Sequence, residues 1–115
     1  MRNRKTVVVE MQGNELVRIF RSEQDASQSA GNVVRLSKPE AILQLRKQVF
    51  ARSRNECERC GKFLTWNTMH MDEKLPRGKG GEYSMENCQA ICYGCHLGRP
   101  DSQHGARKPQ FGKVA

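Results

Sequence analysis

The sequence contains no long hydrophobic run. Its first segment, MRNRKTVVVEMQG, has only three consecutive apolar residues after a basic start. A secretory signal requires a longer apolar segment, and a membrane-spanning helix requires about 20 such residues. We therefore expect a soluble protein without a signal peptide, located in the reducing cytoplasm of a bacterial or host cell.

Hydrophobic residues are also few in total, at 37% of a chain of 115 residues. This length suits one compact domain, and the composition leaves that domain a small core. Small domains with little core often depend on disulfides or on a structural metal. Because a reducing compartment disfavours disulfides, we expect the five cysteines to serve metal binding instead.

Acidic residues are scarce relative to basic ones. The chain has 12 Asp and Glu against 20 Lys and Arg, which gives a formal net charge of +8 and a pI of about 9.6. Such a positive field favours a polyanionic partner, most often nucleic acid. The alternative is a basic protein that its charge merely keeps in solution.

Two short apolar runs lie in residues 4–21, on either side of Gln12-Gly13-Asn14. Glycine and asparagine between β-branched runs favour a tight hairpin. The next stretch, residues 22–32, is polar and rich in Ser, Gln and Gly, so we expect a loop there. The N-terminal part of the chain is thus predicted to be a β-hairpin followed by a loop.

A helix is predicted for residues 37–54. Ser37 and Glu40 have the spacing of a capping box, and a proline lies in the first turn. Apolar residues then recur at helical spacing. The predicted apolar face consists of Ile42, Leu45 and Val49, widened by Leu43 and Phe50. Basic residues, among them Arg46 and Lys47, occupy the rest of the helix, either as a solvated face or as a stripe that faces phosphates.

Four of the cysteines form two C-x-x-C pairs, Cys57 with Cys60 and Cys92 with Cys95, separated by 31 residues. Each pair makes a tight turn, or knuckle, that offers two thiolates, and two knuckles complete a tetrahedral S₄ site that selects Zn²⁺. Two disulfides or a redox C-x-x-C are the alternatives. The fifth cysteine, Cys88, is predicted to be a small buried residue and not a ligand.

The segment between the knuckles is rich in acid–base groups. A strand is predicted for residues 66–71, and on a strand that extends further, His70 and Asp72 share one face while Glu73 points to the other. If zinc holds both knuckles, the segment must fold back on itself. That would bring together His70, Asp72, Asn87 and His96. In addition, residues 84–87 are expected to start a turn of helix.

Asp, His and Asn side chains are a reasonable ligand set for Mg²⁺, Mn²⁺ or a similar divalent ion. Beside a basic surface, such an ion suits phosphodiester chemistry, because it can bind the phosphate and stabilise the leaving oxygen. A nearby His or Glu can take the proton of the attacking water.

The same region resembles the HNH endonuclease (ββα-metal) family. The matching positions are Asp72, Pro76, Gly80-Gly81, Asn87 and the run Cys92-Tyr93-Gly94-Cys95-His96, within residues 56–99. The resemblance implies an α+β fold with a ββα-metal core that a Cys₄ zinc site holds together, preceded by the hairpin and the amphipathic helix. It also implies metal-dependent hydrolysis of DNA that leaves 5′-phosphate and 3′-hydroxyl ends.

By this resemblance, Asp72 and His96 hold the catalytic divalent metal, and Asn87 orders the loop or assists the metal. The family's general base is a histidine directly after the aspartate, and here Glu73 stands in its place. His70 as the base, Glu73 as the base, and a site without a competent base are the three interpretations. A histidine pKa near 6.5 suits activation of water at neutral pH, which favours His70.

The sequence therefore predicts three regions: an N-terminal extension (1–36), a helix with the zinc-bound nuclease domain (37–99), and a basic irregular tail (100–115). The predicted activity is an HNH endonuclease that nicks or cuts DNA. Residues expected to contact nucleic acid are Arg46, Lys47, Arg77, Lys79 and Arg99. The alternatives are a non-catalytic zinc module that binds nucleic acid and a zinc protein–protein adaptor. The resemblance also suggests a phage setting, with phage DNA-packaging proteins as candidate partners.

Overall fold

A computed structural model describes residues 5–98 and has a mixed α+β fold. Within that range no helix is long and apolar enough to cross a membrane. The described residues form two compact units. The first unit comprises residues 5–48 and 73–88, and the second comprises residues 49–72 and 89–98. Both units draw on segments that are distant in sequence, so neither is a continuous piece of chain.

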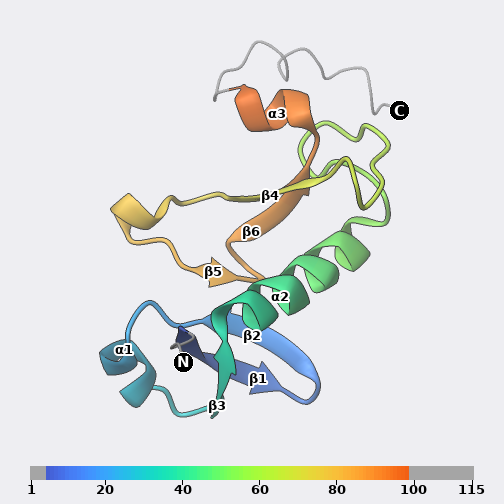
Figure 1. Ribbon diagram of the computed structural model, residues 1–115. Helices are drawn as coiled ribbons and strands as arrows, with labels where there is room; N and C mark the ends of the chain where they lie inside the picture. The colour runs from blue at the N-terminus through green and yellow to red at the C-terminus, as the bar shows by residue number, and fades with distance from the viewer. Residues whose placement is uncertain (1–4, 99–115) are drawn as a thin grey trace. The chain divides into compact units, whose positions relative to one another are not determined.

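The predicted hairpin is confirmed. Strands β1 (Thr6–Gln12) and β2 (Glu15–Ile19) pair antiparallel in the first unit (Figure 1). Gly13 opens the two-residue turn between them with a φ of 64°, a left-handed conformation that glycine adopts without steric cost. Val9, Leu16 and Ile19 are buried in the core of this unit. The β1–β2 register shifts by one residue between Glu10 and Met11, and this irregularity lets Leu16 and Ile19 both be buried although they lie three positions apart.

Two further strands extend this hairpin into a sheet of order β3-β1-β2-β5. Strand β3 (Asn32–Ser37) pairs with β1, and the short strand β5 (Tyr83–Ser84) pairs with β2, both antiparallel. In consequence, the loop between the two cysteine pairs supplies an edge strand to the N-terminal sheet. Sequence analysis did not anticipate either pairing.

The prediction of a plain loop for residues 22–32 is wrong in part, because α1 (Glu23–Ser27) forms within it. The Ser22 hydroxyl accepts a hydrogen bond from the Asp25 N–H (3.1 Å), and acidic residues occupy the first turn. An N-cap serine and acids beside the helix N-terminus both stabilise a helical turn. A polar composition therefore did not exclude local helix here.

Helix α2 (Lys38–Ser53) confirms the predicted helix. The capping box forms as expected: Ser37 Oγ accepts from the Glu40 N–H (3.2 Å), and Glu40 Oε1 accepts from the Ser37 N–H (3.4 Å). The fully buried positions are Ala41, Leu45 and Val49, at a spacing of four residues. Leu43, which was expected to widen the apolar face, is 44% exposed because it lies on the other side of the helix.

Gln48 joins α2 to the sheet of the first unit. Its side-chain oxygen accepts from the Leu16 N–H (2.8 Å), and its side-chain nitrogen donates to the Leu16 carbonyl (2.8 Å). The amide thus satisfies both backbone groups of a buried residue in β2, in the way that a neighbouring strand would.

Strands β4 (His70–Glu73) and β6 (Cys88–Ile91) form a two-stranded sheet, and helix α3 (Tyr93–Leu97) follows β6 directly. This is the ββα order that the resemblance implied. Among the apolar residues buried in the second unit are Leu64, Met69, Ala90 and Ile91. The same unit contains the two cysteine knuckles.

Two local predictions in this region are wrong. The strand begins at His70 and not at residue 66, because residues 66–68 form a turn that Thr68 Oγ1 closes by accepting from the Thr65 N–H (2.9 Å). Residues 84–87 do not start a helix. They form the end of β5 and a turn, in which Ser84 Oγ accepts from the Asn87 N–H (3.0 Å). Hydroxyl groups close both turns in place of the expected regular structure.

Candidate functional site

Both cysteine pairs form tight knuckles. The first knuckle closes through the Gly61 N–H, which donates to the Cys57 carbonyl (2.9 Å), and Gly61 has a φ of 84°. In the second knuckle Cys92 is the N-cap of α3, and its sulfur accepts from the Cys95 N–H (3.5 Å). A glycine turn and a helix start therefore present two sulfurs each.

The four sulfurs lie within 4.8 Å of one another. The Sγ–Sγ distance is 3.8 Å between Cys57 and Cys95 and 3.7 Å between Cys60 and Cys92. A regular tetrahedron with Zn–S bonds of about 2.3 Å has edges of about 3.8 Å, whereas a disulfide bond is about 2.05 Å long. None of the four is joined in a disulfide. The cysteines are thus arranged to hold a metal such as zinc, and the two-disulfide interpretation is wrong.

The electrostatics of the four sulfurs also favour a bound cation. Burial raises the pKa of Cys57, but the backbone N–H groups of Cys60, Arg59 and Cys92 outweigh burial and hold that pKa below its ordinary value. Burial raises the pKa of Cys60 and of Cys95, and the negative charge of Cys57 adds to both shifts. A divalent cation would offset this repulsion and stabilise four thiolates together.

Glu58, inside the first knuckle, binds the knuckle to strand β6. Its backbone N–H donates to the Ala90 carbonyl (2.8 Å), and its Oε1 accepts from the Ala90 N–H (2.8 Å). Arg52 of α2 orients the Glu58 carboxylate through two contacts of 2.8 and 2.9 Å. Arg52 therefore supports the first knuckle through Glu58.

The structure places His70 beside His96. Their rings stack at 4.8 Å between centroids with 7° between the planes, so the His70 face of β4 is turned toward α3. Helix α3 holds His96 in place because the His96 N–H donates to the Cys92 carbonyl (2.9 Å). His96 is exposed, whereas the adjacent Cys95 is buried. One turn of helix thus carries both a buried sulfur and an exposed imidazole.

Asp72 and Glu73 are both half-buried residues of β4. The alternation of a strand puts Asp72 on the face of His70 and Glu73 on the opposite face, and the Oε2 atom of Glu73 is buried. Across residues 5–98, the four cysteines are the only group of three or more Cys, His, Asp or Glu residues whose ligand atoms converge. The structure accordingly brings His70 and His96 together and does not assemble a second ligand group of that size.

Asn87 ties down the loop between β4 and β5. Its Oδ1 accepts from the Leu75 N–H (2.8 Å), and its Nδ2 donates to the carbonyls of Leu75 (3.0 Å) and Glu82 (2.9 Å). Both amide hydrogens are therefore used within the loop. This arrangement fits the loop-ordering role that was one of the two roles implied for Asn87.

Steric constraints explain why glycine occupies positions 80 and 81. Gly80 has a φ of 98°, and a Cβ at Gly81 would lie 1.7 Å from the Leu75 carbonyl oxygen and 3.0 Å from Asn87 Nδ2. Any side chain at Gly81 would have to displace the backbone that Asn87 holds. Gly80, Gly81 and Asn87 are consequently parts of one loop structure.

Residues 57–102 match the family model of the HNH endonucleases. This segment is thus similar to an HNH domain, and residues 57–102 are called the HNH domain for that reason. No curated protein and no solved structure gave a significant match. The HNH segment includes both knuckles, β4, the glycine loop, β6 and α3, and HNH proteins are generally nucleases.

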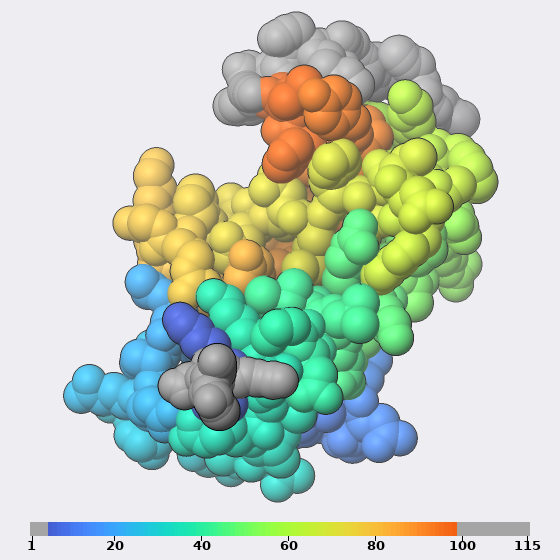
Figure 2. All heavy atoms as spheres, viewed as in Figure 1, coloured from blue at the N-terminus to red at the C-terminus, as the bar shows by residue number. Residues whose placement is uncertain are grey.

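Two of the predicted nucleic-acid contacts lie on the loop of the HNH domain. Arg77 and Lys79 belong to a short 3₁₀ helix, η1 (Arg77–Lys79), and both are exposed. The Arg77 guanidinium lies over the Tyr83 ring (5.5 Å), and Arg21 donates to the Arg77 carbonyl (3.5 Å). Figure 2 shows this loop at the surface in yellow to light orange. Arg21 is thus a neighbouring basic residue that sequence analysis missed.

The other predicted contacts differ in exposure. Lys47 is exposed on α2 and Arg46 is half-buried. Arg99 lies outside the described residues, as does the predicted basic tail. Cys88 is fully buried, as predicted, and lies outside the group of four cysteines that could hold a metal ion.

Proposed function

We propose that the protein is a metal-dependent HNH endonuclease that hydrolyses phosphodiester bonds of DNA. In this proposal the four cysteines bind a structural Zn²⁺, and Asp72 and His96 hold a second divalent ion, Mg²⁺ or Mn²⁺. The observation that carries the proposal is the placement of His96. The HNH match includes its C-x-x-C-H motif, and the motif sets His96 against His70 of β4.

The chemistry would proceed at the face of β4 that His70 and Asp72 share. A divalent ion held there would neutralise charge on the phosphate and stabilise the leaving oxygen. His70 would accept the proton of the attacking water, a role that imidazole commonly fills in catalysis. Glu73 is the weaker candidate for the base, because it faces away from Asp72 and its Oε2 atom is buried.

Asn87 acts as a positioning residue in this proposal, since its amide is occupied by the loop. Arg77 and Lys79 on that loop would contact DNA phosphates, as would Lys47 on α2. Such contacts bind DNA of any sequence and weaken as the salt concentration rises. The chain's net charge of +8 is consistent with this mode of binding. An interaction with phage DNA-packaging proteins stays a prediction.

A plasmid-nicking assay with Mg²⁺ or Mn²⁺ tests the proposal. We expect the wild type to convert supercoiled plasmid to nicked or linear DNA, and Asp72→Ala and His96→Ala to reduce the rate by at least about 100-fold. Glu86→Ala is the matched control, because it removes an exposed carboxylate from the turn after β5. Undiminished cleavage by Asp72→Ala or His96→Ala, with one zinc still bound, would contradict the assignment of the catalytic ion.

The base is tested separately. His70→Ala should reduce cleavage by about 10²–10⁴-fold, the usual contribution of a general base, and should leave the affinity for Mn²⁺ unchanged. If Glu73→Gln has this effect and His70→Ala does not, Glu73 is the base.

The second candidate is a zinc-bound module that binds DNA without cutting it. Glu73 at the position of the family's base histidine is the observation that favours it. If the protein is such a module, we expect salt-dependent DNA binding in a gel-shift assay. We also expect no nicking of plasmid DNA with Mg²⁺, Mn²⁺, Ni²⁺ or Co²⁺. Any metal-dependent nicking that Asp72→Ala abolishes would exclude it.

A further inference from the structure

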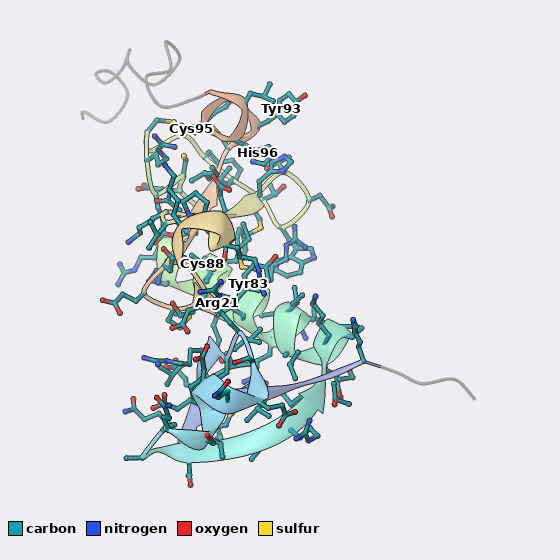
Figure 3. All side chains as sticks on the ribbon, turned by 90° about the vertical axis from the view of Figure 1, so that its left-hand side faces the viewer. Arg21, Tyr83, Cys88, Tyr93, Cys95 and His96 are labelled. Carbon is teal, nitrogen blue, oxygen red and sulfur yellow. The ribbon has the colours of Figure 1, made fainter. Side chains whose placement is uncertain are left out.

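Helix α3 presents an exposed aromatic ring beside the paired histidines. Tyr93 is 60% exposed, and its ring lies 5.5 Å from that of His70, which in turn stacks on His96. Tyr93 and His96 are three residues apart, so they lie on one side of the helix. Figure 3 shows both side chains extending to the same side of α3.

The zinc knuckle fixes the position of this ring. Tyr93 is the first residue of α3 and directly follows Cys92, whose sulfur caps the helix. The next ligand, Cys95, is 5% exposed and lies on the buried side of the same turn. A metal that holds both sulfurs would therefore also fix Tyr93, whose side chain is exposed and lies outside the core. A large exposed ring that the backbone positions is suited to contact a ligand.

We propose that Tyr93 packs against the sugar and base of the nucleotide next to the scissile phosphate. This inference rests on the proposed DNA-cleaving function, because His96 marks the position of that phosphate. A DNA strand carries one phosphate for about every 3.4 Å of helix axis. The Tyr93 ring, 5.5 Å from the His70 ring, would therefore face an adjacent nucleotide and not the reacting phosphate itself.

The proposed contact between Tyr93 and a nucleotide does not depend on the DNA sequence. Every base and every sugar offers an apolar face, and stacking of a nucleotide on an aromatic ring needs no base-specific hydrogen bond. Leu97 lies one turn beyond Tyr93 and is 48% exposed, so it extends the apolar surface. Tyr93 would orient the strand while His70, Asp72 and His96 act on the phosphate.

The test compares Tyr93→Ala, Tyr93→Leu and Tyr93→Phe with Phe63→Ala. Phe63 is the matched control, because it is an exposed ring (69%) on the first knuckle. DNA binding is measured by fluorescence anisotropy on a labelled mixed-sequence duplex without added Mg²⁺ or Mn²⁺, and kcat and KM are measured with the metal. Zinc content and thermal unfolding are recorded for each variant.

Loss of the aromatic face should raise Kd and KM by about 5- to 100-fold, the range for one stacked nucleotide, with a smaller change in kcat. Tyr93→Leu keeps an apolar side chain on the helix and should weaken binding as Tyr93→Ala does. Tyr93→Phe and Phe63→Ala should stay within about twofold of the wild type. A purely structural role would instead lower the unfolding temperature and leave the Kd of the folded protein unchanged.

The inference is overturned if Tyr93→Ala and Tyr93→Leu bind DNA as the wild type does, or if Phe63→Ala weakens binding equally. Its failure is distinguishable from that of the proposed function. A wild type that cleaves with unchanged Tyr93 variants refutes only the stacking contact. A wild type that never cleaves, but whose DNA binding depends on Tyr93, supports the contact and refutes the nuclease.

Discussion

The glycine loop of the HNH domain yields a graded mutational prediction, because three of its glycines differ in their surroundings. At Gly78 a Cβ would meet nothing within 4 Å, and the backbone is not left-handed. At Gly80 the space is also open, but φ is +98°. At Gly81 a Cβ would lie 1.7 Å from the Leu75 carbonyl oxygen. We therefore expect alanine to be progressively less tolerated from the first glycine to the third.

The magnitudes follow from the contacts. Gly78→Ala should change the free energy of unfolding by less than about 0.5 kcal/mol, as surface substitutions usually do. Gly80→Ala should cost about 1–2 kcal/mol, the penalty of a left-handed residue with a Cβ. Gly81→Ala must separate the loop segments that three Asn87 side-chain hydrogen bonds join. At about 0.5–1.5 kcal/mol for each bond, it should cost about 2–4 kcal/mol.

Urea unfolding of the three variants with saturating zinc measures these free energies. Hydrogen exchange at the Leu75 amide, which donates to Asn87, provides a local readout and should accelerate only in Gly81→Ala and, more weakly, in Gly80→Ala. Equal stability of Gly81→Ala and Gly78→Ala would refute the close approach and, with it, the role assigned to Asn87.

Three further predictions concern the metal and its support. Cys92→Ser should reduce zinc from one ion per chain toward none and unfold the second unit, whereas Cys88→Ala should keep full zinc occupancy; atomic absorption and thermal unfolding measure both. Acidification should weaken zinc binding in the wild type, because protons compete for the thiolates, as titration with a chelator at several pH values would show. Glu58→Ala should cost about 1–3 kcal/mol in urea unfolding because the β6 amide loses its acceptor, and Glu58→Gln should cost less because it retains a side-chain oxygen.

The sequence predicted those elements whose signals are local. A glycine and an asparagine between two β-branched runs predicted the β1–β2 hairpin, and Ser37 with Glu40 predicted the start of α2. In each case the stabilising contacts join residues a few positions apart, so spacing alone carries the information. The C-x-x-C pairs are equally local, and the sulfurs of the two pairs do converge.

Elements that depend on distant partners were missed. Strand β5 has two residues and pairs with β2 more than sixty positions away in sequence, and a segment of two residues has no periodicity to detect. The same holds for Glu58, whose carboxylate accepts a hydrogen bond from the Ala90 N–H, 32 positions away in sequence. The residues next to Glu58 in the sequence give no sign that its carboxylate has a hydrogen-bond partner and is not simply exposed to solvent.

The placement of the base depends on strand alternation. The family's histidine directly follows the aspartate, so it would lie on the face of β4 opposite Asp72. Here that position holds Glu73, and the only histidine of β4 is His70, on the same face as Asp72 and against His96. His70 cannot reproduce the family's arrangement by a small shift of a side chain, because the two positions point to opposite sides of the strand. A reaction that uses His70 must therefore bring water in from the side of α3, the side on which Tyr93 is exposed.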